Sequence, residues 1–104
     1  MTRPEHAEDH SGVTFPAFTD FNGREFHNVS FRGAVFEGKV TFQNAKFSGA
    51  CDFSGAVFKG PSDFSNSAFH GDAVFAKTTF DEPSKFASVQ FAQRANFSAA
   101  RFSH

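Results

Sequence analysis

The chain has 104 residues, which is enough for one domain of ordinary size. It contains 18 phenylalanines but no leucine, isoleucine, tryptophan or tyrosine, so its core cannot be the usual mixture of aliphatic shapes. The net charge of −1 gives no strong attraction to nucleic acid or anionic lipid, and we expect neither as a partner. The single cysteine excludes an internal disulfide and fits a reducing compartment.

The first twenty residues lack a regular spacing of apolar residues. Residues 1–12 are polar and predict a disordered tail. Phe15 and Phe18 lie beside Pro16, and we expect residues 13–20 to form a cap over the repeat that follows. No apolar run resembles a signal peptide or a membrane span, so we expect a cytoplasmic protein with no membrane partner.

From residue 21 onward the phenylalanines are regularly spaced. The step is five residues from Phe21 to Phe36 and then alternates six and five as far as Phe102, so the period becomes eleven. The residue two positions before each phenylalanine is usually small or β-branched, and the residue two positions after it is often Gly or Asn. We therefore expect one repeat domain over residues 21–104. Its predicted structural core consists of Phe21, Phe26, Phe31, Phe36, Phe42, Phe47, Phe53, Phe58, Phe64, Phe69, Phe75, Phe80, Phe86, Phe91, Phe97 and Phe102.

This spacing excludes both a helix and a continuous strand. A helix turns about 100° per residue, so a five-residue step would distribute the phenylalanines around its surface. In a strand the side chains alternate between two faces, so the same step would place successive phenylalanines on opposite faces. A short extended piece followed by a corner satisfies the pattern, because Gly or Asn at the corner tolerates positive φ. Each unit then forms one side of a coil.

The number of sides follows from two prolines. Pro61 and Pro83 each lie three residues after a phenylalanine, and two of the eleven-residue periods separate them. Four sides of alternating five and six residues also add up to two eleven-residue periods, so the two prolines would lie one full coil apart. A four-sided coil would stack Phe58 between Phe36 and Phe80, and the chain would form about four coils of an all-β solenoid with stacked central phenylalanines.

The units resemble those of a known family. Ala45-Lys46-Phe47-Ser48-Gly49 and Ala56-Val57-Phe58-Lys59-Gly60 resemble pentapeptide repeats, which read A-x-F-x-G or A-x-L-x-x. The resemblance covers most of the chain, from Phe21 to Phe102, and it implies a right-handed quadrilateral β-helix. The chain departs from the family pattern in its alternation of five and six residues and in having Phe at every centre, so it would be an atypical variant.

No catalytic, cofactor-binding or metal site is expected. His6 and His10 are four residues apart and could share a metal ion on a helix, but the polar tail predicts two solvated side chains. His27 and His70 directly follow a phenylalanine, where a side chain should point outward. We expect no cofactor.

Cys51 and two aspartates also have structural interpretations. Cys51 occupies the small inward position and should be buried and unreactive. Asp52 and Asp63 precede phenylalanines in successive units, and in a four-sided coil they fall on different faces. A paired-carboxylate site is therefore not expected.

Two functions compete. The first is a non-enzymatic protein–protein interaction or scaffold module of unknown partner, since a rigid rod would present the outward residues Lys46, Asp52, Asp63, Lys85, Gln90 and Arg101. The second is implied only by the resemblance: some pentapeptide-repeat proteins mimic DNA and bind DNA gyrase, which requires a strongly negative rod. Residues 21–104 carry a net charge of +2, with nine Lys or Arg against seven Asp or Glu. An enzyme is disfavoured because an interior filled by phenylalanine leaves no pocket. A degenerate gene product that keeps the fold without a function also fits the sequence.

The C-terminal end has no predicted cap. The sequence stops two residues after Phe102, and the last coil should expose rings and unpaired backbone. We expect self-association there, as a homodimer through the C-terminal coil. The alternative is that the sequence is part of a longer gene product. Lys85, Arg94 and Arg101 make this end mildly basic, which predicts a solvated face.

Overall fold

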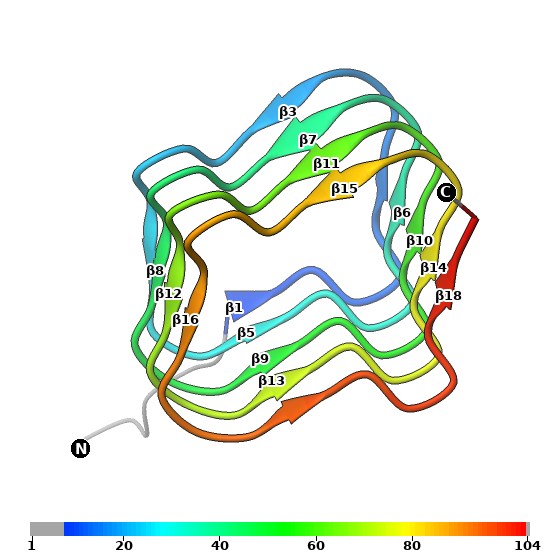
Figure 1. The fold of residues 1–104 in the computed structure, drawn as a ribbon. Coiled ribbons are helices and arrows are strands. Elements are labelled where there is room, and N and C mark those ends of the chain that lie inside the picture. The colour runs from blue at the N-terminus through cyan, green and yellow to red at the C-terminus, as the bar shows by residue number, and fades with distance from the viewer. Residues whose placement is uncertain (1–7, 104) are drawn as a thin grey trace, which may run out of the picture.

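The computed structural model describes residues 8–103, which form eighteen strands of two residues each and no helix that could cross a membrane. The strands lie on four sides of a square tube (Figure 1). The view in Figure 1 is along the tube axis with the C-terminal coil nearest the reader, and the chain winds counterclockwise toward the reader. The solenoid is therefore right-handed, all-β and quadrilateral, as expected.

The four sides are named A to D in the order in which the chain first reaches them. Side A contains β1 (Glu8–Asp9), β5 (Val29–Ser30), β9 (Cys51–Asp52), β13 (Ala73–Val74) and β17 (Ala95–Asn96). Side B contains β2 (Thr14–Phe15), β6 (Val35–Phe36), β10 (Val57–Phe58), β14 (Thr79–Phe80) and β18 (Arg101–Phe102). Side C contains β3 (Thr19–Asp20), β7 (Val40–Thr41), β11 (Ser62–Asp63) and β15 (Ser84–Lys85). Side D contains β4 (Glu25–Phe26), β8 (Lys46–Phe47), β12 (Ala68–Phe69) and β16 (Gln90–Phe91).

Every strand pairs in parallel with the strand one coil away. Phe58 is in register with Phe36 below it and with Phe80 above it. The predicted repeat of two eleven-residue periods per coil is confirmed from Val29 onward, where Val29 pairs with Cys51. Because neighbouring coils supply each other's backbone partners, the fold is stabilised mainly by contacts between adjacent coils.

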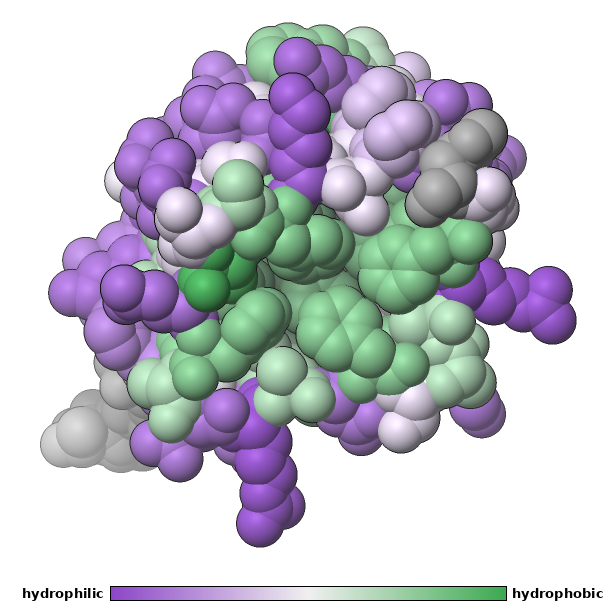
Figure 2. All heavy atoms as spheres, in the orientation of Figure 1, coloured by the Kyte–Doolittle hydropathy of each residue, from purple (hydrophilic) through white to green (hydrophobic). Residues whose placement is uncertain are grey.

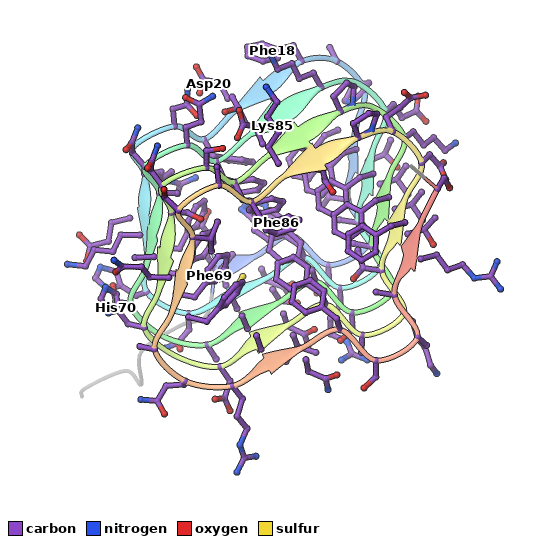
Figure 3. The ribbon with its side chains drawn as sticks, viewed as in Figure 1. Phe18, Asp20, Phe69, His70, Lys85 and Phe86 are labelled. Carbon is purple, nitrogen blue, oxygen red and sulfur yellow. The ribbon has the colours of Figure 1, made fainter. Side chains whose placement is uncertain are left out.

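The phenylalanine rings form four columns inside the tube. Rings that follow one another in a column are stacked, with centroids 4.3 to 5.1 Å apart. Rings of different columns meet at an angle, as Phe42 of side C and Phe53 of the opposite side A do at 5.7 Å and 89°. Figure 3 shows Phe69 and Phe86 pointing into the tube, whereas His70 and Phe18 point away from it. The arrangement combines stacked and edge-to-face contacts, both of which aromatic rings favour.

The rings of the predicted core are buried in the middle of the chain and less buried toward both ends of the tube. Eleven central rings, from Phe26 to Phe80, are buried. Phe21, Phe86, Phe91 and Phe97 are only partly buried. Phe102 is 47% exposed and is not a core residue. The reason is that it has a coil on one side only.

The predicted boundaries at the N-terminus need correction. The solenoid begins by Glu8 and not at Phe21, because β1, β2 and β3 pair with β5, β6 and β7 in the same parallel manner as later strands. Residues 8–12 therefore form a side and a corner of the first coil, and residues 13–20 form further sides of this coil and not a separate cap. This coil is one residue shorter than the later ones, because Phe15 pairs with Phe36 whereas Val29 pairs with Cys51. The spacing of the later coils therefore does not predict the register of the first one. Residues 1–7 of the expected tail lie outside the described residues.

Corners that lead from side A to side B or from side C to side D lie within a five-residue step and are β-turns. The Ala56 N–H donates to the Phe53 carbonyl at 3.0 Å, and Gly55 between them has a φ of 69°. Positive φ at this position is the mark of a type II turn and favours Gly or Asn. Lys77 occupies the equivalent position in the next coil and Ala99 in the coil after that. They adopt φ of 60° and 58°, although neither residue type favours positive φ.

Corners that lead from side B to side C or from side D to side A lie within a six-residue step from Phe36 onward, and their glycines have a different role. Gly60 has no positive φ, but a Cβ atom there would lie 2.5 Å from the carbonyl carbon of Gly38 in the coil below. Glycine is thus required for close backbone approach between coils at this corner.

Candidate functional site

The C-terminal end of the tube is an open apolar face. Figure 2 looks onto this end and shows apolar side chains at its centre, surrounded by polar ones. Phe102 is 47% exposed, and Phe86, Phe91 and Phe97 are partly exposed. No coil among residues 8–103 lies above these rings, and strands β15 to β18 have one open edge each. We call this surface the C-terminal face; it comprises Phe86, Phe91, Phe97, Phe102 and the edges of β15 to β18.

Basic side chains surround the C-terminal face. The last turn of the chain, residues 82–103, contains Lys85, Arg94 and Arg101 against one acid, Glu82, which leaves a net charge of +2. None of the three cations makes a salt bridge within residues 8–103. The face therefore combines an apolar centre with a rim of net positive charge.

The N-terminal end is built differently. His10 occupies the position that phenylalanine takes in later coils, and its ring stacks on Phe31 at 5.1 Å. Glu8 accepts a hydrogen bond from His10 Nε2 at 2.7 Å and pairs with the Arg24 guanidinium at 2.9 Å. The same guanidinium lies over the Phe26 ring, 4.7 Å from its centroid. We call this surface the N-terminal face; it comprises His10, Phe15, Phe21, Phe26, Glu8, Arg24 and the edges of β1 to β4.

The sequence interpretation missed the N-terminal face. The polar composition of residues 1–12 predicts that His10 belongs to a tail together with His6, and His6 lies outside the described residues. A usable signal was present, since His10 lies five residues before Phe15 and two before Gly12, which has a φ of 70°. The spacing of the phenylalanines does not include this position, because residue 10 is a histidine.

Comparison with known families agrees with this geometry. A family model of pentapeptide repeats, nine copies, matches residues 21–68. The coils described above continue the same arrangement on both sides of that segment, from Glu8 to Phe102. The chain is a pentapeptide-repeat protein. No curated protein sequence matches it.

The pentapeptide-repeat β-solenoid is in general a non-catalytic scaffold. In this chain the candidate residues Cys51, Asp52 and Asp63 have structural roles. Cys51 is buried at the inward position predicted for it. Burial, and to a smaller extent the charge of Asp52, raise the pKa of its thiol well above the ordinary range. The thiolate form that a nucleophile requires is therefore disfavoured.

The aspartates of this pentapeptide-repeat protein stabilise its turns. Asp52 on side A accepts a hydrogen bond from the Ser54 N–H at 2.8 Å and pairs with Arg32 at 3.0 Å. Burial alone would raise the pKa of Asp52, but these bonds and the Arg32 charge outweigh it and lower the pKa. The position directly before a central phenylalanine suits a side chain that caps the following turn.

Asp63 repeats this arrangement on side C. It accepts hydrogen bonds from the Ser65 N–H at 2.9 Å and from Gln43 Nε2 at 2.7 Å. Burial alone would raise the pKa of Asp63, but these bonds and the charge of Lys85 together lower it. Asp52 and Asp63 lie on different sides of the tube, as the four-sided coil predicts.

One shallow pocket lies on side C. Its volume is about 180 Å³, and it is lined by Lys39, Pro61, Ser62, Asp63, Pro83 and Lys85. The Asp63 carboxylate that faces it is already bonded to Gln43 and Ser65. Among residues 8–103 there is no group of three His, Cys, Asp or Glu side chains placed to hold a metal ion. His27 and His70 are exposed at corners, as predicted.

The side faces carry mixed charge. Lys46 and Gln90 lie on side D, Arg101 on side B and Lys85 on side C, and all four are exposed. Side A has outward acids at Asp9 and Asp52 only, and its other outward strand residues are Ser30, Val74 and Asn96. A continuous acidic stripe is absent from the strands of all four sides within residues 8–103.

Proposed function

We propose that this pentapeptide-repeat protein is a non-enzymatic protein-interaction module and that its binding site is the C-terminal face. The observation that carries the proposal is the exposure of Phe102 at the end of a stacked ring column. Soluble proteins seldom leave a group of aromatic rings uncovered, and such patches mark interaction sites. Rings held by the stack below them lose little side-chain freedom on binding, which favours affinity.

The chemistry of this face predicts the chemistry of its partner. A partner should place apolar groups over Phe86, Phe97 and Phe102 and acidic groups near the rim. The open edges of β15 to β18 can also accept strands from the partner, as in β-augmentation. The gyrase-binding alternative has no supporting observation, because it requires a continuous acidic surface and the four sides do not provide one.

The test is binding by the intact chain and by two matched variants. Phe102→Glu places a charge in the apolar centre, whereas Lys46→Glu reverses a charge on side D far from the end. Each immobilised variant is challenged with the same protein extract after circular dichroism has verified its fold. We expect Phe102→Glu to lose proteins that Lys46→Glu retains. Equal retention by both variants would refute the C-terminal face as the binding site.

A further inference from the structure

We infer that the C-terminal face binds the N-terminal face of a second copy of this chain, rotated by half a turn about the tube axis. Copies would then stack head to tail. This inference rests on the proposed function, because it names the partner of the same face. It follows from the shapes of the two ends, from the eleven-residue repeat and from the distribution of charge.

The shapes of the two ends determine the rotation. The chain climbs steadily as it passes from side to side, so each end of the tube is a ramp and not a flat surface. The upper ramp rises through β15, β16, β17 and β18, and the lower ramp begins with β1, β2, β3 and β4. The two ramps meet without a gap only when β1 lies on β15, β2 on β16, β3 on β17 and β4 on β18. Since β1 is on side A and β15 is on side C, the second copy is turned by half a revolution.

The eleven-residue repeat makes this rotation compatible with strand pairing. Each coil contains two such repeats, so opposite sides have the same kind of strand. Strands β1 and β15 both end one residue before a central ring, whereas β2 and β16 both end on the ring itself. The rotated copy therefore continues the parallel register found between all adjacent coils. The pairs across the interface would be Asp9 with Lys85, Phe15 with Phe91, Asp20 with Asn96, Glu25 with Arg101 and Phe26 with Phe102.

Charge favours this arrangement over a symmetric dimer. The first coil, residues 8–28, contains Glu8, Asp9, Asp20 and Glu25 against Arg24, a net charge of −3. The last turn, residues 82–103, has a net charge of +2. Head-to-tail stacking brings these opposite charges together and places Asp9 beside Lys85 and Glu25 beside Arg101. A homodimer through two C-terminal faces would instead oppose two basic rims, which costs free energy.

Two features of the N-terminal face limit the strength of the contact. The Arg24 guanidinium lies 4.7 Å from the Phe26 centroid, which is the place that Phe102 of a second copy would take in the column. Arg24 must therefore turn outward before the ring can enter. Pro16 has no N–H, whereas Glu37 at the equivalent position donates to the Phe15 carbonyl at 2.9 Å. The contact would thus lack one backbone hydrogen bond, and association should be reversible.

The assembly that results is open. An interface between two different faces leaves one free face at each end, so copies can add without limit. The mass of the assembly should increase with protein concentration and should not stop at two copies. It should decrease as salt is raised from about 50 to 500 mM, because salt screens the rim charges.

The test is analytical ultracentrifugation of the full chain with charge reversals at the two ends. Glu25→Lys alone and Arg101→Glu alone should each weaken association about three- to tenfold, and the two together in one chain should restore it. Lys59→Glu, at an exposed corner in the middle of the tube and far from both faces, is the control and should have no effect. Arg24→Ala should strengthen association, because it empties the place that Phe102 needs.

Three results would overturn the inference: a mass that stops at two copies, a Glu25→Lys variant that associates normally, or a chain that stays monomeric at about 100 µM. None of them removes the proposed function, which fails only if Phe102→Glu leaves all protein binding unchanged. A partner of different sequence that requires Phe102 but is indifferent to Glu25 would retain the proposed function and exclude the second copy.

Discussion

The ring of Phe58 lies 4.7 Å from the ring of Phe36, with an angle of 8° between their planes, although the two residues are one full coil apart in the chain. A second parallel contact, at 4.9 Å, joins Phe58 to Phe80. A ring in the middle of a column is thus enclosed above and below by other rings and at the sides by neighbouring columns.

Replacement of a central ring should destabilise the solenoid strongly. Phe58→Ala leaves a cavity that stacked neighbours cannot fill, and we expect it to lower the free energy of unfolding by about 3–5 kcal/mol. Phe102→Ala is the matched control, because this ring is half exposed and has one stacked neighbour. Urea denaturation followed by circular dichroism measures both. Equal losses in the two variants would contradict the ring columns as the main source of stability.

Replacement of Lys77 by glycine should stabilise the folded protein. Its φ of 60° is a conformation that costs an L-residue about 1–2 kcal/mol, whereas glycine adopts it freely. Glycine loses about 0.5–1 kcal/mol of this gain through the entropy of the unfolded chain, so Lys77→Gly should raise stability by about 0.5–1 kcal/mol. Thermal unfolding detects such a change. Lys59→Gly, where φ is not positive, should lower the melting temperature, and a rise in both variants would refute the explanation.

The two kinds of glycine should respond differently to alanine. In Gly60→Ala the new Cβ would lie 2.5 Å from the backbone carbonyl carbon of Gly38, so the coils must separate locally. In Gly55→Ala no atom lies within 4 Å of the new Cβ, and the cost is limited to about 1–2 kcal/mol for positive φ. We expect Gly60→Ala to lose more stability than Gly55→Ala in chemical denaturation. The reverse order would show that the six-residue corners can relax.

Acid should destabilise the protein through Asp52 and Asp63. The pKa of each carboxyl is lower in the folded chain than in the unfolded one, so its contribution to stability is complete above the unfolded pKa. That contribution is lost as pH falls through the folded pKa, and stability should decline below about pH 4. Asn can make the same turn contact, as Asn96 does with the Ser98 N–H at 2.9 Å. The Asp52→Asn, Asp63→Asn double variant should therefore stay folded and show a flatter profile of unfolding free energy against pH. An unchanged profile would exclude these two groups as its source.

Most of the repeat could be predicted because its signal is local and recurs. A five-residue step followed by a six-residue step is incompatible with a helix or a long strand, and the recurrence of Pro61 at Pro83 sets four sides. The sequence pattern does not distinguish the two kinds of corner. Gly55 and Gly60 look alike in the sequence, and the first is needed for positive φ while the second is needed for close approach of Gly38. That difference depends on the coil below, which is far away in the chain.

The sequence by itself determined the tube and its ring columns, because the spacing of phenylalanines decides which side chains can point inward within each unit. Only the tertiary structure decided where the tube begins and which rings are covered. His10 belongs to a ring column and Phe102 is half exposed, and neither fact follows from a local pattern. The physical reason is that burial at an end depends on whether another coil lies against it, and that is a property of the stacked coils and not of any single repeat.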